Sequence, residues 1–296
     1  MSPQKRATII ASVVATILTI VKFAIGVASG SVAVLASAID SLLDTVISIF
    51  NFFAIKKSEE KATDRFQYGK GKVQAIAAVI EGTIITLSGL YIIYEAINKA
   101  IHATETTLLN SAIMVMIFSI VVTFLLVNYL LSVAKKTGNL VIKSDALHYK
   151  TDLLSNGVIL LSLVIVYFTG LNIIDAIFGL GIGVYIIYSA YEIIEEGIFI
   201  LLDHALDSKI IAQIDKEIKE HPQVNSYHWL KTRTDGTNNF VEFHLVLEPD
   251  MKLLEAHRIS DQIEESIKKL DDKRQWIITP HYDPYDDEDI NNGDML

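Results

Sequence analysis

Long apolar stretches separated by short polar connections occupy the first two thirds of the chain. Several of them reach the roughly 20 residues that a helix needs to cross a bilayer, and few charged residues interrupt them. We predict a membrane α-helical domain with six transmembrane helices, at residues 8–29, 31–55, 73–98, 111–134, 141–168 and 173–199. In the last of these, the small residues Gly179, Gly181 and Gly183 predict close packing against a neighbouring helix.

From about residue 205 onward the pattern becomes that of a small α+β domain. Apolar positions spaced as on one face of a helix alternate with segments of strand-like periodicity, and Asp235-Gly236 is a turn signal. In chain order the pattern predicts a helix at 208–220, strands at 224–233 and 238–249, a helix at 253–270 and a strand at 275–283. The order αββαβ predicts a two-layer, ferredoxin-like fold.

These patterns divide the chain into three parts. Residues 1–202 form the predicted six-span transmembrane domain, and residues 203–283 form the predicted α+β domain. Residues 284–296 are acidic and poor in apolar side chains, so we predict that this tail is disordered.

Basic residues gather in every second connection between the predicted helices. Lys5 and Arg6 precede the first helix, and further lysines and arginines lie in 56–72 and 135–143. Connections rich in lysine and arginine face the cytoplasm. Both termini are therefore predicted to be cytoplasmic, on either side of an integral membrane domain in the lipid bilayer.

The formal net charge of −10 comes entirely from residues 203–296, because the charges of residues 1–202 cancel. An acidic domain repels nucleic acid and attracts cations, so we expect no nucleic-acid partner. The chain has no cysteine. Any metal must therefore be held by histidine and carboxylate side chains.

Two pairs of ionisable residues lie inside predicted transmembrane helices, where charge is costly. Asp40 and Asp44 are four residues apart in the second helix, and His148 and Asp152 are four apart in the fifth. This spacing places both members of a pair on one helix face. An unpaired carboxylate at this depth costs about 2.5–3.5 kcal/mol, which a bound cation would offset. Because the pairs lie at matching depths in antiparallel helices, we predict one site for a divalent cation rather than separate interhelical contacts.

Other polar residues in these helices have a less specific interpretation. Asp145 shares a face with His148 and Asp152, and could lie on the access route to the site. We assign Asn51 and Glu81 to packing or charge-balancing contacts between helices. Leu147, beside His148, is a candidate apolar gate.

The complete pattern resembles the cation diffusion facilitator family. The shared features are Asp-x3-Asp and His-x3-Asp in the second and fifth of six spans, followed by a cytosolic α+β domain. The segments HYKTD, LLDHALD and IITPHYDP are similar to the bacterial zinc and ferrous-iron efflux branch. The resemblance implies a homodimer that exchanges a divalent metal for protons, with Asp40, Asp44, His148 and Asp152 as the transport site. It also implies the bacterial inner (plasma) membrane.

The resemblance implies a second metal site in the cytosolic domain, at the dimer interface. Strand periodicity alone places His228 and His244 on neighbouring strands. The family pattern adds further ligands and a two-metal, regulatory or dimer-stabilising role. The residues that it maps to this site are His228, His244, His257, His281 and Asp283.

Two further family features concern charged residues near the membrane surface. Lys72 and Asp203 match a charge pair at the dimer interface. Asp64 matches one ligand of a metal site in the loop 56–72, but Phe66 and Lys70 stand where histidines are expected. Since a lysine repels a cation, we predict that this loop site is absent or crippled.

We therefore expect a secondary active transporter that exports Zn²⁺, with Cd²⁺ and Fe²⁺ also compatible with the ligands, and Mn²⁺ not excluded by them. Zinc would be both the cargo and the cytosolic structural or regulatory ion, and no organic cofactor is expected. Two other classes use the same ligands: a metal-gated channel and a metal-sensing membrane protein. An intramembrane metallohydrolase would need a motif such as HExxH, which is absent, so we expect no enzyme activity.

Overall fold

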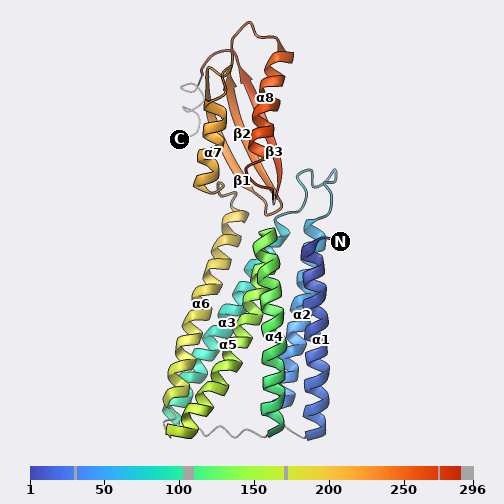
Figure 1. The fold of residues 1–296 in the computed structure, drawn as a ribbon, viewed down its shortest axis with the longest axis vertical. Helices are drawn as coiled ribbons and strands as arrows, with labels where there is room; N and C mark the ends of the chain where they lie inside the picture. The colour runs from blue at the N-terminus through green and yellow to red at the C-terminus, as the bar shows by residue number, and fades with distance from the viewer. Residues whose placement is uncertain (30–31, 103–109, 170–172, 273, 288–296) are drawn as a thin grey trace. The chain divides into compact units, whose positions relative to one another are not determined.

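The structure is a computed structural model that describes residues 1–29, 32–102, 110–169, 173–272 and 274–287. At some helical positions, including Asp40 and Asp175, it describes the backbone alone. The chain divides into two compact units, Met1–Ile198 and Phe199–Leu296 (Figure 1). The division falls a few residues before the boundary expected at residue 202.

The described part of the first unit is built from long helices, as the apolar stretches predicted. Their order follows the predicted spans, with ends that extend a few residues into the polar connections. The helices are α1 (Pro3–Ser29), α2 (Val32–Ser58), α3 (Val73–His102), α4 (Asn110–Thr137), α5 (Leu140–Thr169) and α6 (Ile173–Leu201).

Four segments among the described residues are long and apolar enough to cross a membrane by length and composition alone: Pro3–Ile25, Val73–Asn98, Ile117–Thr137 and Ile177–Leu201. They lie in α1, α3, α4 and α6. In α2 and α5, ionisable side chains interrupt the apolar sequence. These are the two helices that carry the predicted transport site.

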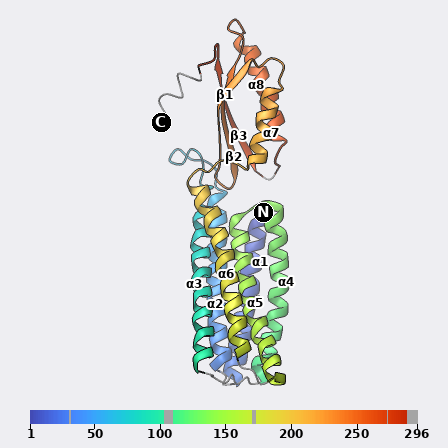
Figure 2. The same ribbon diagram turned by 90° about the vertical axis from the view of Figure 1, so that its left-hand side faces the viewer.

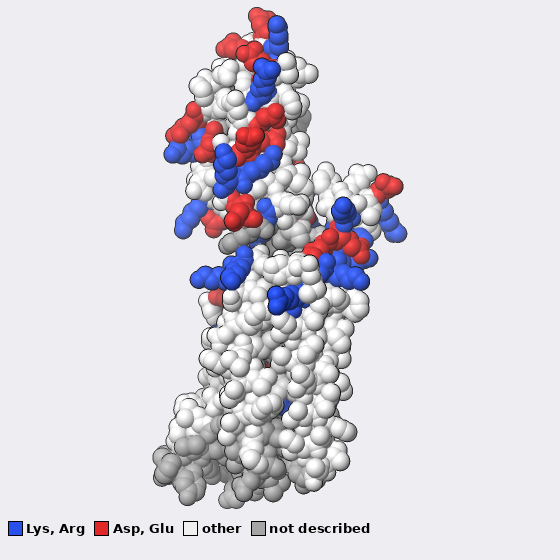
Figure 3. Space-filling model, turned by 45° about the vertical axis from the view of Figure 1, so that its right-hand side comes forward, with Lys and Arg blue, Asp and Glu red and all other residues white. Residues whose placement is uncertain are grey.

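Large apolar side chains cover the outside of the first unit. Phe23, Leu125 and Tyr188 are all more than half exposed, and many others like them line the helices. On the face shown in Figure 3 the helices are almost free of charged groups along their length, while lysine and arginine gather at one end. Such a surface is stable against lipid but not against water.

Small residues set the spacing of several helices. Ala7, Ala11 and Ala15 form a buried row on α1 within the main apolar cluster of the unit. Helices α3 and α6 run side by side (Figure 2) and approach closely at glycines. A Cβ added at Gly183 would lie 2.5 Å from Ile93 Cγ1 and 3.0 Å from the Gly89 carbonyl oxygen.

The glycine prediction for the sixth span is confirmed at two positions and wrong at one. A Cβ at Gly179 would lie 2.9 Å from Ala96 Cβ, so Gly179 and Gly183 both face α3. A Cβ at Gly181 would meet nothing within 4 Å among the residues that the structure describes. Residues two apart on a helix point in different directions, so the three glycines cannot share one contact.

The second unit has the predicted αββαβ order. Its elements are α7 (Ser208–Lys219), β1 (Ser226–Thr234), β2 (Asn238–Val246), α8 (Leu253–Lys268) and β3 (Gln275–Asp283). Strand β2 is central, antiparallel to β1 and parallel to β3. The predicted turn is present: Gly236 has φ 92°, and Asp235 Oδ1 accepts hydrogen bonds from the backbone N–H groups of Thr237 and Asn238.

Both helices of this unit pack on one face of the sheet (Figure 2). Their buried isoleucines, such as Ile214 and Ile263, meet Phe243 and Leu245 of β2. The hydroxyl of Tyr227 also donates to Asp215 of α7. This hydrogen bond and one from Lys219 lower the pKa of the Asp215 carboxyl below its usual value. Because strand residues alternate between faces, His244 lies on the face that these helices leave uncovered.

The contact between α3 and α6 predicts different outcomes for two neighbouring glycines. Gly183→Ala should destabilise the protein by about 1–3 kcal/mol, because the added methyl group overlaps Ile93 and the Gly89 carbonyl. Gly181→Ala, the matched control, should be neutral or stabilising by up to ~1 kcal/mol, because its position is open and alanine favours helix. Thermal unfolding of the purified protein in detergent measures both. Equal effects of the two substitutions would contradict this packing.

Candidate metal centres

The first cluster of metal-binding side chains lies between α2 and α5. Asp44, His148 and Asp152 each offer a ligand atom, and these atoms lie within 4.8 Å of one another. His148 Nε2 is 3.0 Å from Asp44 Oδ1. The structure thus brings together three of the four residues predicted for transport. The fourth, Asp40, lies in α2, but its side chain is outside the described residues.

Surroundings of this membrane cluster differ on its two sides. An open surface groove of about 600 Å³ lies between α3 and α5, with Asp152, Asn156 and Tyr91 among its lining residues. Toward the start of α5 the neighbouring side chains are buried, including Tyr149, whose hydroxyl is 2.7 Å from Ser48 Oγ. Leu147 is also buried next to His148, and its role as a gate stays a prediction.

Further buried hydrogen bonds join α2, α3 and the start of α5, on the side of Tyr149 away from the membrane cluster. Gln74 of α3 donates to Ser58 Oγ of α2 over 2.8 Å and accepts from Asn139 Nδ2 over 2.9 Å. Asn139 immediately precedes α5, where its side chain accepts from the backbone N–H of Ile142. These polar contacts fasten α2, α3 and α5 together at one end of the unit.

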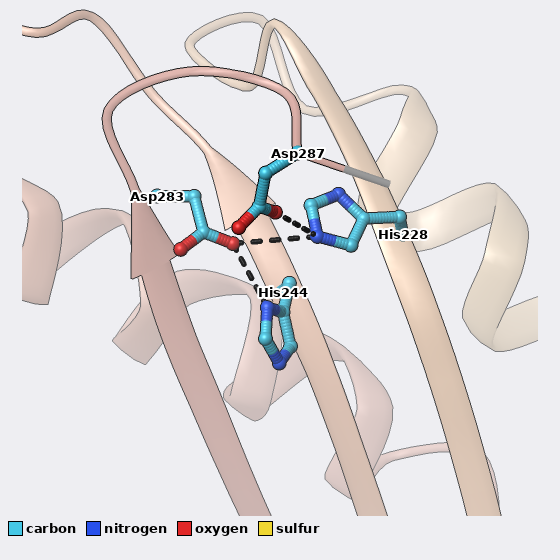
Figure 4. A group of neighbouring side chains, drawn as sticks. All are labelled: His228, His244, Asp283 and Asp287. Carbon is cyan, nitrogen blue, oxygen red and sulfur yellow. Dashed lines mark hydrogen bonds and ion pairs between the residues drawn. The ribbon is translucent and has the colours of Figure 1, made fainter. Parts of the chain in front are cut away.

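The second cluster lies on the uncovered face of the sheet in the second unit (Figure 4). It consists of His228, His244, Asp283 and Asp287, whose ligand atoms again lie within 4.8 Å of one another. Strand register produces it, because His228 pairs with His244 and Val246 pairs with Asp283. A β-bulge follows His228 in β1, and bulges re-aim side chains at the point where they occur.

Distances within this sheet cluster suit a bound cation. Asp283 Oδ2 is 2.8 Å from His244 Nδ1 and 3.4 Å from His228 Nε2, and Asp287 Oδ1 is 3.0 Å from the same His228 nitrogen. His228 is buried, and neither of its ring nitrogens has a hydrogen bond of good geometry within the described residues. Two imidazoles and two carboxylates form a donor set that fits tetrahedral Zn²⁺.

The sheet cluster differs from the predicted one in its membership. His281 and His257 are both exposed and do not belong to the group, although His281 Nε2 is 3.2 Å from Asp283 Oδ1. Asp287 belongs to the group but was placed in the tail predicted to be disordered. Residues 284–287 of this tail are described, and its residues 288–296 lie outside the described part of the chain.

The remaining predicted sites receive less support. Asp64 is exposed and belongs to neither cluster found among the described residues. In the same loop Lys70 pairs with Glu60 over 2.8 Å and lies over the Phe66 ring. Asp203 pairs with Arg233 over 3.2 Å, and its pairing with Lys72 stays a prediction.

Family comparisons cover nearly the whole chain. A family model described as "Cation efflux transmembrane domain" matches residues 8–202, and one described as "Cation efflux protein, cytoplasmic domain" matches residues 206–285. The chain belongs to the cation efflux family. This family consists of transporters, so the expectation that the chain is not an enzyme is confirmed. The protein is an integral membrane protein with a cytoplasmic C-terminal domain.

Curated relatives agree with the family models. The "Cation-efflux pump FieF" proteins of Citrobacter koseri and Escherichia fergusonii are both 34% identical to the chain over 279 residues, covering 94% of this chain and 92% of each relative. A solved chain from a mode-of-action study of CzrB is 30% identical, covering 26% of this chain and 98% of its own. Its TM-score is 0.24, so it adds nothing to the fold.

The family assignment orients the helices of this cation efflux protein. Because the cytoplasmic domain follows α6, the end of α6 is cytoplasmic, and so are the end of α2 and the starts of α3 and α5. The buried contacts around Ser58, Gln74 and Asn139 therefore lie at the cytoplasmic ends of their helices. The groove beside Asp152 lies farther from those ends.

The sheet cluster predicts that two adjacent acidic residues differ in their effect on zinc binding. In an Asp44→Ala background, Asp287→Asn should weaken the remaining Zn²⁺ binding by at least about tenfold, because it removes a direct ligand. Asp286→Asn is the matched control: this residue lies 3.6 Å from His228 Nδ1 and outside the group, so its effect should be smaller. Titration calorimetry on the full-length protein measures both. A larger loss of Zn²⁺ binding in Asp286→Asn than in Asp287→Asn would contradict the assignment of Asp287 to the sheet cluster.

Proposed function

We propose that this cation efflux protein is a secondary active transporter that exports a divalent metal, chiefly Zn²⁺, from the cytoplasm in exchange for protons. The observation that carries the proposal is the grouping of Asp44, His148 and Asp152 between two apolar helices. Carboxylates and an imidazole in such surroundings need a cation to balance them. Two carboxylates and an imidazole are also ligands that Zn²⁺, Cd²⁺ and Fe²⁺ accept.

Asp40 completes the proposed ligand set. It lies one turn before Asp44 on α2, so both residues occupy the same face of the helix. With it the site has three carboxylates and one histidine, enough for a tetrahedral ion with no open position. A closed site of this kind suits carriage of an ion rather than chemistry on a substrate.

Proton exchange follows from the chemistry of the ligands. Histidine and carboxylates bind a metal only when deprotonated, so protons and metal compete for one site. A site that faces each side of the membrane in turn would load metal where protons are scarce and release it where they are abundant. An inward proton gradient would then drive the metal outward.

Alternating access is supported by the unlike surroundings of the membrane cluster. Asp152 borders an open groove, whereas the cytoplasmic side is packed by Leu147, Tyr149 and the hydrogen bonds of Gln74. We propose that opening to the cytoplasm separates α2 from α5 on that side, with Leu147 and His148 both moving with α5. The helices need not unfold, because the contacts to be broken are between side chains.

The cytoplasmic domain supplies the proposed regulation and dimerisation. The sheet cluster would bind Zn²⁺ and favour pairing of two chains as cytoplasmic metal rises. His257 lies apart from this cluster within one chain, so its predicted part in the site requires the second chain of a homodimer. The Lys72–Asp203 pair belongs to the same proposed interface. The bacterial inner membrane is the proposed location, in keeping with relatives from Citrobacter and Escherichia.

A metal sensor or a metal-gated channel is the alternative. The observation that favours sensing is the sheet cluster, which lies in the cytoplasmic domain and shares no residue with the membrane cluster. Coupling of metal flux to the proton gradient distinguishes these classes, because only a coupled transporter accumulates metal against the metal's own gradient.

Transport by reconstituted protein tests the proposal. In proteoliposomes, wild type should accumulate Zn²⁺ when an opposing proton gradient is imposed, and Asp44→Ala should abolish that accumulation because it removes a ligand of the membrane cluster. Asp64→Ala is the control: it removes an exposed loop carboxylate that belongs to neither cluster, and accumulation should be unchanged. Metal content of the vesicles is measured over time.

Other results would favour the alternatives. Downhill flux that ignores the proton gradient would identify a channel. No flux of any divalent metal tested, with intact binding to the cytoplasmic domain, would leave sensing as the function.

A further inference from the structure

Three buried polar side chains meet on the cytoplasmic side of the membrane cluster: Asn51 of α2, Glu81 of α3 and Asp145 of α5. None of them is more than 1% exposed. The Asn51 side-chain nitrogen lies 3.1 Å from Glu81 Oε2 and 3.3 Å from Asp145 Oδ1, and donates to both. One amide group from one helix therefore links carboxylates of two others.

The hydrogen bonds of this trio are incomplete. Glu81 Oε1, Asp145 Oδ2 and Asn51 Oδ1 are buried, and none of them has a hydrogen-bond partner within the described residues. All three atoms are acceptors, and they come from three different helices. The hydroxyls of Ser144 and Ser48 also lie close to Glu81 and Asp145, but like Asn51 they are neutral donors. Two buried carboxylates with neutral donors are strongly destabilising unless protons or a bound cation neutralise them.

We propose that Asn51, Glu81 and Asp145 form a second binding site for a divalent cation, between the cytoplasm and the membrane cluster. Asn51 lies two turns from Asp44 toward the cytoplasmic end of α2, and Asp145 lies about one turn from His148 toward the cytoplasmic start of α5. The trio shares no residue with the membrane cluster. A cation that enters from the cytoplasm along α2 and α5 would reach the trio first.

The ligands of the trio indicate which cations it binds. Two carboxylates and an amide carbonyl offer oxygen alone, which suits hard cations such as Mn²⁺ and Mg²⁺ better than Zn²⁺. The membrane cluster contains His148 and therefore favours Zn²⁺ more strongly. Cargo would pass from a weaker site to a tighter one. That the bound ion is cargo rests on the proposed function, whereas the existence of the site does not.

Equilibrium binding of Mn²⁺ to the full-length protein in detergent tests the site directly. The background is a variant in which both other clusters are removed by Asp44→Ala, Asp152→Ala, His228→Ala and His244→Ala. This background should still bind one Mn²⁺ per chain, detected by the loss of the free-ion electron paramagnetic resonance signal. Adding Glu81→Gln should abolish that binding or weaken it by at least about tenfold, because a direct ligand is lost.

Two controls separate a lost site from a lost fold. Glu81→Gln preserves shape, and the new amide oxygen can still accept from Asn51; Asp145→Asn is a second substitution of the same kind and should have the same effect. Glu95→Gln changes another carboxyl group on α3, several turns away, and should leave Mn²⁺ binding intact. Size-exclusion profiles of all variants should match that of wild type.

Several results would overturn the proposal. If the background binds no Mn²⁺, the trio holds protons alone, and if binding survives both Glu81→Gln and Asp145→Asn, the ion lies elsewhere. These results are independent of transport by wild type, so they leave the proposed function untouched. In proteoliposomes, Glu81→Gln alone should raise the metal concentration for half-maximal transport, and no change would overturn the assignment of the ion as cargo.

Discussion

The free-energy cost of burying a charge in apolar surroundings determines where the ionisable side chains of the transmembrane unit lie. Lipid-facing surfaces of the helices are apolar, so the ionisable groups of α2, α3 and α5 lie toward one another. Within that interior each carboxylate needs a hydrogen-bond donor, a proton or a metal ion. Asn51 donates to two carboxylates at once. A cation bound at the proposed sites would therefore stabilise this region as well as being carried through it.

The cytoplasmic unit uses similar ligands under a different constraint. Its cluster lies on a sheet whose other face packs against α7 and α8, and strand register rather than helical spacing brings His228, His244 and Asp283 together. Water reaches the edge of this face, so empty ligands cost less than they do in the membrane. If the proposed cytoplasmic site binds metal, the cost of losing it falls mainly on the buried His228.

Local periodicity accounts for what could be predicted from the sequence. Apolar stretches specified α1–α6, a spacing of four placed His148 and Asp152 on one face, and Asp235-Gly236 marked the turn between β1 and β2. Tertiary contacts account for the rest. Asp287 reaches His228 only because the chain after β3 folds back over the sheet. The acidic composition of the tail predicted disorder instead, so this contact was not expected. Asn51, Glu81 and Asp145 come from three helices, so no sequence spacing relates them.

Polar contacts toward the cytoplasmic ends of α2, α3 and α5 explain how the proposed transport site could be closed on that side and still open. Interhelical hydrogen bonds in membranes contribute only about 0.6 kcal/mol on average, so the bonds of Ser48 and Gln74 are individually weak. A large apolar contact, by contrast, would leave a void when the helices part. Weak polar bonds separate at small cost where water can enter and replace each partner. In the proposed mechanism, α2, α3 and α5 would close over a cation and open again, while the close glycine contact would keep α3 together with α6.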